Sequence, residues 1–255
     1  MSGPRLTIGV VDYGAGNLAS VARAITGLGH RCRVTRDTET LAAADAIVLP
    51  GVGAFPAAMA SLHEHGLVDF LRQQARGGQP LIGICLGMQL LADMSLEHRL
   101  TAGLGLIPGR VRPLAGARWH IGWNTIEVDP ADTLLSPSDG QSLYFNHAYA
   151  FDTPPPYCVG ISRLADAFTV AVRRGKVVPP PWRRAAAADE AVCAGRAPPA
   201  PGAAHDIDQP ARATPAVHEV VPQHATDVLD WCTVAAGNVL VTCYMRAVVN
   251  ALQCR

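Results

Sequence analysis

One cysteine stands where a strand is expected to turn into a helix. Cys85 ends the apolar run 81–84, and Gly83 and Gly87 lie two residues to either side of it. This pattern predicts a buried strand that bends sharply into a helix, with glycines where a Cβ atom would crowd the bend. Free N–H groups and a partial positive charge at a helix start favour a thiolate, so we expect Cys85 to be a reactive nucleophile. The same pattern also fits a buried cysteine that packs as a small apolar side chain.

The elements around Cys85 alternate between strand and helix patterns. Strand-like runs cover residues 6–11, 32–35, 46–49 and 81–85, and helix-like patterns cover 18–28, 57–63 and 67–74. This order predicts an open, mostly parallel α/β sheet, in which ligands bind at the carboxyl ends of the strands. Gly14, the loop 50–53 and Cys85 all follow strands, so we expect them to converge. Shorter strand-like runs predict an antiparallel extension over residues 121–128, 142–151, 157–162 and 168–178.

The composition excludes several classes of ligand. The chain has 255 residues, of which 49% are hydrophobic and 16% charged, and its formal net charge is +0. This balance gives no indication of nucleic acid or a membrane as a partner. We recognise no signal peptide and no run long enough to span a bilayer. The 7 cysteines lack C-x-x-C pairs, so we expect a cytoplasmic protein with reduced thiols, no metal site and no cofactor.

Five segments carry a resemblance to a known family. They are Asp-Tyr-Gly-Ala-Gly-Asn at 12–17, Leu-Pro-Gly-Val-Gly-Ala-Phe at 49–55, Gly-Ile-Cys-Leu-Gly-Met-Gln at 83–89, residues 103–110, and His-Ile-Gly-Trp-Asn at 120–124. On these segments, residues 6–178 resemble a class I (triad-type) glutamine amidotransferase. More narrowly, they resemble the glutaminase subunit of imidazole glycerol phosphate synthase. The 83–89 segment is shared by all triad amidotransferases, whereas segments 12–17, 50–55 and 122–124 are more specific to this subunit.

The resemblance implies a thiol that hydrolyses the side-chain amide of L-glutamine. Cys85 would attack the amide, form a glutamyl thioester and release ammonia. Backbone N–H groups would bind the oxyanion, and they belong to Gly51, Val52, Gly53 and Leu86. Three further residues would hold the substrate, namely Gln89, His147 and Tyr149. Without the resemblance, residues 50–53 also fit an ordinary turn, and Gln89 also fits a solvated helix position.

A partner follows from the same resemblance. The ammonia would pass to a cyclase subunit, a (β/α)8 barrel, within a heterodimer that serves histidine biosynthesis. We expect the 12–17 loop and residues 120–124 at this interface, with Trp123 as an exposed anchor. The alternative for Trp123 is a position in the core. We expect His120 and His147 to be packed or interface histidines rather than bases.

The pattern of the family breaks after Val178. A triad enzyme needs a histidine base and a carboxylate, which this family carries as His-Pro-Glu on a strand at this point. Here three prolines follow at 179–181, and prolines cannot form a central strand. We therefore predict an incomplete amidotransferase domain over 1–178, without its closing strand and helix, and an aberrant tail over 179–255.

The tail has two competing origins, a real extension or a reading-frame shift near codon 178. Its weak periodicity and its Ala-, Pro- and Arg-rich composition favour the shift and a disordered tail. Its histidines beside carboxylates are poor candidates for a replacement base; they are His205, His218 and His224. The run 239–245 could form a strand, which would be an aggregation liability if it were exposed and poorly paired.

Three functional hypotheses follow from a family-like domain that is joined to an aberrant tail. The first is a glutaminase subunit whose activity is impaired by the missing base and carboxylate. The second is a catalytically silent subunit that still binds the cyclase. The third is a different cysteine hydrolase on the same α/β scaffold, against which segments 12–17 and 122–124 argue.

Overall fold

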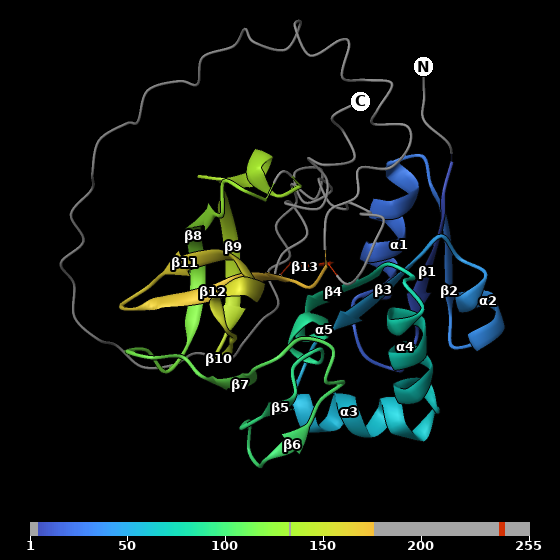
Figure 1. Cartoon of the computed structure of the whole chain (residues 1–255), viewed down its shortest axis with the longest axis horizontal. Helices are drawn as coiled ribbons and strands as arrows, with labels where there is room; N and C mark the ends of the chain where they lie inside the picture. Colours follow the sequence, from blue (N-terminus) through green and yellow to red (C-terminus); the bar gives the residue numbers. More distant parts are fainter. Residues whose placement is uncertain (1–4, 133, 176–239, 243–255) are drawn as a thin grey trace, which may run out of the picture.

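The computed structural model describes residues 5–132, 134–175 and 240–242, and its centre is a parallel sheet (Figure 1). The parallel strands lie in the order β2 (Arg31–Thr35), β1 (Thr7–Val11), β3 (Ala46–Gly51) and β4 (Leu81–Cys85). Each strand pairs in parallel with its neighbour in this order. The predicted mostly parallel α/β sheet is therefore confirmed.

Helices cover both faces of this sheet because its side chains alternate between two cores. The helices are α1 (Leu18–Gly27), α2 (Thr38–Ala42), α3 (Phe55–Glu64) and α4 (Leu67–Arg76). Val10 and Val48 pack on one face with Ile25 of α1. Ile47 and Leu49 point the other way, into the core that holds the buried sides of α3 and α4. Three of these helices match the expected patterns, whereas the short α2 was not predicted.

The predicted antiparallel extension is also present. Its elements are β5 (Met94–Ser95), β6 (Thr101–Ala102), β7 (Arg110–Pro113), β8 (His120–Val128), the 3-10 helix η1 (Ser136–Ser138), β9 (Ser142–His147), β10 (Tyr149–Asp152), the 3-10 helix η2 (Pro155–Tyr157), β11 (Cys158–Arg163) and β12 (Ala167–Arg173). Strand β8 pairs with β9 and β11, and β11 leads through β12 to β10 and β7, always antiparallel.

One expected strand is in fact two. The run 142–151 breaks at Ala148, because β9 pairs with β8 whereas β10 pairs with β7 and β12. At the break, the Ala148 carbonyl accepts a hydrogen bond from the Leu114 N–H at 3.0 Å. The chain thereby changes sheet partners within one residue. As a result, His147 ends β9 and Tyr149 begins β10, on either side of the break.

A segment from far along the chain joins the parallel and antiparallel halves. Strand β13 (Leu240–Thr242) lies parallel to β4 and antiparallel to β12. The strand that the run 239–245 could form is present over these three residues, and both of its edges are paired. The predicted loss of the family's closing strand and helix concerns a part of the chain of which residues 176–239 and 243–255 are not described. Among the described residues, no helix is long and apolar enough to cross a bilayer.

Candidate active site

Cys85 lies at a sharp bend at the carboxyl end of β4. Its backbone has φ 56° and ψ −116°, and the chain then enters the single-turn helix α5 (Leu86–Gln89). A positive φ is uncommon for a residue with a side chain and is a feature of strained functional turns. The predicted bend from strand to helix is therefore confirmed.

The two glycines beside the cysteine are required by close backbone contacts. A Cβ atom on Gly83 would lie 2.5 Å from the Gly87 carbonyl oxygen, and one on Gly87 would lie 1.9 Å from the Leu49 carbonyl oxygen. Both distances are far below van der Waals contact, so any side chain here would displace the start of α5. The glycines therefore allow α5 to pack directly on the ends of β3 and β4.

The protonation of Cys85 differs from the expectation. Burial raises the pKa of the thiol, and the hydrogen bond from the Leu86 N–H lowers it by a smaller amount. The N–H at the start of α5 thus acts in the predicted direction, but burial of Cys85 beside an apolar cluster outweighs it. The free thiol thus needs an external base to become a nucleophile.

The loop 51–53 starts beside the cysteine. Gly51 ends β3 and stands opposite Cys85 in the parallel register. A Cβ atom on Gly51 would lie 2.6 Å from the Gly87 nitrogen, so the loop and the start of α5 are in direct contact. Val52 is exposed, and Gly53 has φ +91°. The structure therefore brings Gly51, Cys85 and Leu86 together.

Two of the predicted substrate-holding residues meet at the backbone of the third. The Gln89 side-chain amide donates to the Tyr149 carbonyl at 3.0 Å. The His147 Nδ1 donates to the same carbonyl at 2.9 Å. Gln89 is buried rather than solvated. The three residues therefore form one hydrogen-bonded group, which links α5 to the junction of β9 and β10.

The sequence matches the model of a known protein family. The model described as "Glutamine amidotransferase class-I" matches residues 9–177, which contain the whole arrangement around Cys85. The chain belongs to this family. The fold agrees, since a solved structure titled "Crystal structure of glutamine amidotransferase" superimposes with a TM-score of 0.53 at 24% identity, over 66% of this chain and 85% of that one.

Relatives of this amidotransferase carry a more specific name. The chain is similar to "Imidazole glycerol phosphate synthase subunit HisH" of Streptococcus gordonii, with 42% identity over 66% of this chain and 83% of the relative. The subunit of the same name from Listeria monocytogenes is 37% identical over the same shares of both chains. In Streptococcus mutans the identity is 44%, over 58% of this chain and 76% of the relative. The resemblance found on the five sequence segments is therefore confirmed.

The two histidines of this amidotransferase that could act as bases are packed instead. The His120 ring stacks on Phe145 with centroids 4.8 Å apart, and it lies 5.4 Å from the His147 ring. Phe168 contacts both histidines. Burial lowers the pKa of His120 and, more than any other cause, that of His147. The Nδ1 of His147 is bound to the Tyr149 carbonyl and not to the thiol.

Two buried residues next to the 50–53 loop were not predicted as site residues. The Glu97 carboxylate accepts from the Phe55 N–H at 2.7 Å and so holds the start of α3, directly after the loop. Tyr13 is fully buried, and its hydroxyl donates to the Pro50 carbonyl at 2.8 Å. Of the two, only Tyr13 had a recognisable signal, because it lies in segment 12–17. Glu97 lies in a segment without a recognisable motif.

Aromatic side chains gather on the outer face of β8 and β9. Trp123 is 69% exposed and meets Tyr144 edge to face with ring centroids 5.7 Å apart. Ile121 and Trp119 are also exposed. The expectation of an exposed Trp123 is confirmed, and the alternative of a core tryptophan is excluded. We call these four side chains the aromatic patch.

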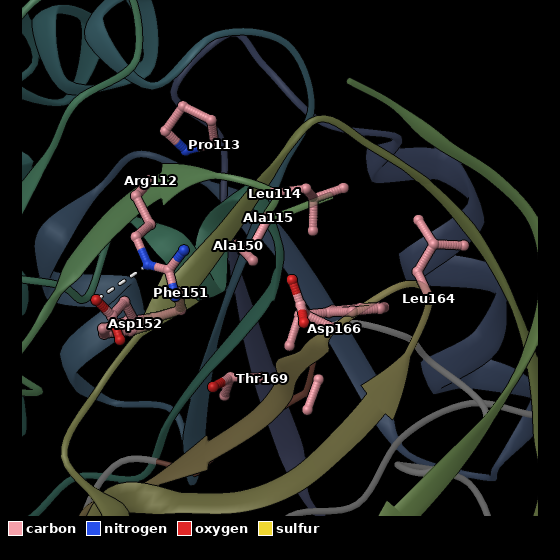
Figure 2. Close-up of a pocket in the computed structure, with 12 residues that line it drawn as sticks. Arg112, Pro113, Leu114, Ala115, Ala150, Phe151, Asp152, Leu164, Asp166 and Thr169 are labelled. Atoms are coloured by element: carbon pink, nitrogen blue, oxygen red, sulfur yellow. Dashed lines mark ion pairs between the residues drawn. The ribbon is translucent and has the colours of Figure 1, made fainter. Parts of the chain in front are cut away.

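A small pocket in another part of the molecule contains none of the predicted site residues. Figure 2 shows it between β7, β10 and β12, with Arg112 directed toward Asp152. The pocket volume of about 80 Å³ suits a few water molecules. The Arg112 Nε lies 3.0 Å from the Asp152 carboxylate, which neutralises the guanidinium.

The buried histidine pair predicts a loss of stability in acid. Both pKa values are lowered in the folded state, so the unfolded chain binds more protons as the pH falls below about 6.5. The contribution of the neutral histidines to the free energy of unfolding should thus be complete above this pH. Below it the free energy of unfolding should decrease, by at most about 1.4 kcal/mol per pH unit for each histidine. Urea unfolding between pH 7 and pH 5 measures this slope.

A matched pair of variants separates the histidine pair from other acid effects. His120→Phe keeps an aromatic ring against Phe145 and should make the slope shallower, because one titrating group is removed. His63→Gln replaces an exposed histidine on α3 and serves as the control. An unchanged slope in His120→Phe would contradict the assignment.

Proposed function

We propose that this chain is the glutaminase subunit of an imidazole glycerol phosphate synthase, with Cys85 as its nucleophile. The observation that carries the proposal is the bend at Cys85, held at a positive φ opposite the glycine loop that begins at Gly51. The relatives named as HisH subunits support the same assignment. The role would be histidine biosynthesis in the cytoplasm.

The proposed reaction is a thiol attack on an amide. The Cys85 thiolate attacks the side-chain carbonyl carbon of L-glutamine, and a tetrahedral oxyanion forms. Backbone N–H groups stabilise this oxyanion, from Leu86 and from the loop residues Gly51, Val52 and Gly53. The C–N bond then breaks, ammonia leaves with an added proton, and water hydrolyses the thioester to glutamate.

Substrate binding is proposed for the group around the Tyr149 carbonyl. Gln89 and His147 both donate to this carbonyl, so the position of the Gln89 amide is fixed before any ligand arrives. Its amide oxygen is then oriented to accept a hydrogen bond from glutamine. Such a fixed acceptor reduces the ordering cost of binding.

The aromatic patch and the 12–17 loop are proposed as the docking surface for the cyclase, a (β/α)8 barrel. Large exposed aromatic side chains are typical anchors of protein interfaces. The loop lies close to the catalytic group, since Tyr13 contacts Pro50. A heterodimer formed on these surfaces would deliver ammonia directly to the second subunit.

Activity of this chain is proposed to be weak. A partly buried thiol with a raised pKa needs a base, and the two candidate histidines, His120 and His147, are packed among aromatic rings. The domain 1–178 would thus keep the nucleophile but lack the other two members of the triad, and the tail 179–255 would follow in place of the segment that carries them in the family. The exposed aromatic patch also supports a second candidate, a catalytically silent subunit that binds the cyclase.

A glutaminase assay with the cyclase subunit present tests the weak activity. We expect turnover about 10³-fold or more below that of an intact triad enzyme, because loss of triad members removes at least that much from a nucleophilic enzyme. Cys85→Ala should abolish whatever turnover remains. Turnover similar to an intact HisH relative would contradict the proposed impairment, and co-purification without Cys85-dependent turnover would favour the silent subunit.

The docking surface makes a separate prediction. Trp123→Ala should weaken binding to the cyclase by about 30-fold, the effect of losing an interface anchor worth about 2 kcal/mol. Leu100→Ala is the matched control, because Leu100 is 68% exposed, similar to Trp123, but lies outside the aromatic patch. Calorimetric titration measures both variants, and equal affinities would exclude the patch as the docking surface.

A further inference from the structure

Tyr13 belongs to the 12–17 loop and is buried against the end of β3, near Cys85. Hydrogen bonds hold both its side chain and its backbone. Its side chain is fully buried, and its hydroxyl donates to the Pro50 carbonyl at 2.8 Å. Its own backbone carbonyl accepts a hydrogen bond from the Ser61 hydroxyl on α3. The hydroxyl therefore has a fixed position relative to both β3 and α3.

The acceptor of this hydrogen bond belongs to the peptide that precedes the glycine loop. A peptide unit is planar, so a donor that fixes the Pro50 carbonyl also fixes the direction of the Gly51 N–H. A Cβ atom on Gly51 would lie 2.9 Å from the Tyr13 hydroxyl oxygen. The hydroxyl thus packs directly against the first residue of the loop proposed to bind the oxyanion.

A second contact from the same loop supports Pro50. Gly16 has φ +113°, and a Cβ atom there would lie 3.2 Å from the Pro50 ring. The 12–17 loop therefore contacts Pro50 twice, through the Tyr13 hydroxyl at the carbonyl and through Gly16 at the ring. Proline has no N–H, so its carbonyl is the only backbone group through which Pro50 can be held by hydrogen bonding.

The chemistry of the hydroxyl suits a permanent donor. Burial raises the pKa of Tyr13, and the negative charge of a Cys85 thiolate raises it further. The phenol therefore stays protonated while Cys85 ionises. The hydrogen bond to Pro50 is thus maintained in the state in which the thiolate reacts.

We propose that Tyr13 is a positioning residue that holds the Pro50–Gly51 peptide in the orientation needed for oxyanion binding and connects this peptide to the 12–17 loop. The inference rests on the proposed function, because it assigns Tyr13 a role in the same site. Tyr13 does not act on the substrate itself. It acts through the backbone of the glycine loop.

Two chlorinated reagents separate positioning from simple access to the thiol. A chloroketone analogue of glutamine has its carbonyl at the place of the amide carbonyl, and chloroacetamide lacks the amino-acid part. In both reactions the Cys85 sulfur forms a C–S bond, the C–Cl bond breaks, chloride leaves with the electron pair, and buffer takes the thiol proton. Only the chloroketone gains from an ordered oxyanion site.

Tyr13→Phe is the decisive variant, because it removes the hydroxyl and keeps the ring. We expect chloroketone labelling of Cys85 to become at least about 10-fold slower, whereas loss of a direct oxyanion donor costs about 10² to 10³. Chloroacetamide labelling should stay within about twofold of the native chain, since this reaction needs no such donor. Tyr157→Phe, in the 3-10 helix η2, is the matched control and should change neither rate.

The possible outcomes separate this inference from the proposed function. Protection of the native chain by glutamine, together with an unchanged ratio of the two rates in Tyr13→Phe, would overturn only the inference. No protection by glutamine in the native chain would overturn both the proposed glutamine site and the inference that depends on it. Should Tyr13→Phe fail to fold, Ser61→Ala releases the other end of Tyr13, and an unchanged ratio there would overturn the inference equally.

Discussion

The candidate site depends on one close contact between backbones, where α5 crosses the ends of β3 and β4. Gly83, Gly87 and Gly51 allow this contact, since a Cβ atom on any of them would collide with backbone atoms. The contact forces Cys85 into a positive φ and places it opposite the glycine loop. Glycine loses more conformational freedom on folding than any other residue. The side chains buried on both faces of the sheet must offset this loss of entropy.

The same packing that positions Cys85 also suppresses its ionisation. Burial around the sulfur raises the pKa of the thiol more than the Leu86 N–H lowers it. In a triad enzyme a histidine removes this obstacle by taking the proton. Strand β13 lies directly beside the strand that ends at Cys85, so a segment of the tail occupies the neighbouring position in the sheet. The function of the chain therefore depends on what the tail brings to this position.

Much of the fold could be predicted because its signals are local. Apolar runs bounded by glycines marked the parallel strands, and Cys85 was recognisable from its two flanking glycines. The break at Ala148 was not recognisable, because it depends on which strands pair with β9 and β10. The pairing of Leu240–Thr242 with β4 joins residues far apart in the sequence. The raised pKa of Cys85 was missed for a related reason, since burial is a property of the assembled core.

Cys85 is well positioned for attack but its thiol is not activated. The pH dependence of its labelling by chloroacetamide, followed at the Cys85 peptide by mass spectrometry, measures this state of the thiol. We expect a labelling rate that is low near neutral pH and still increases above about pH 8.5, the ordinary pKa of a free thiol. A rate that reaches its plateau below about pH 7, as for thiolates activated by a neighbouring histidine, would contradict it.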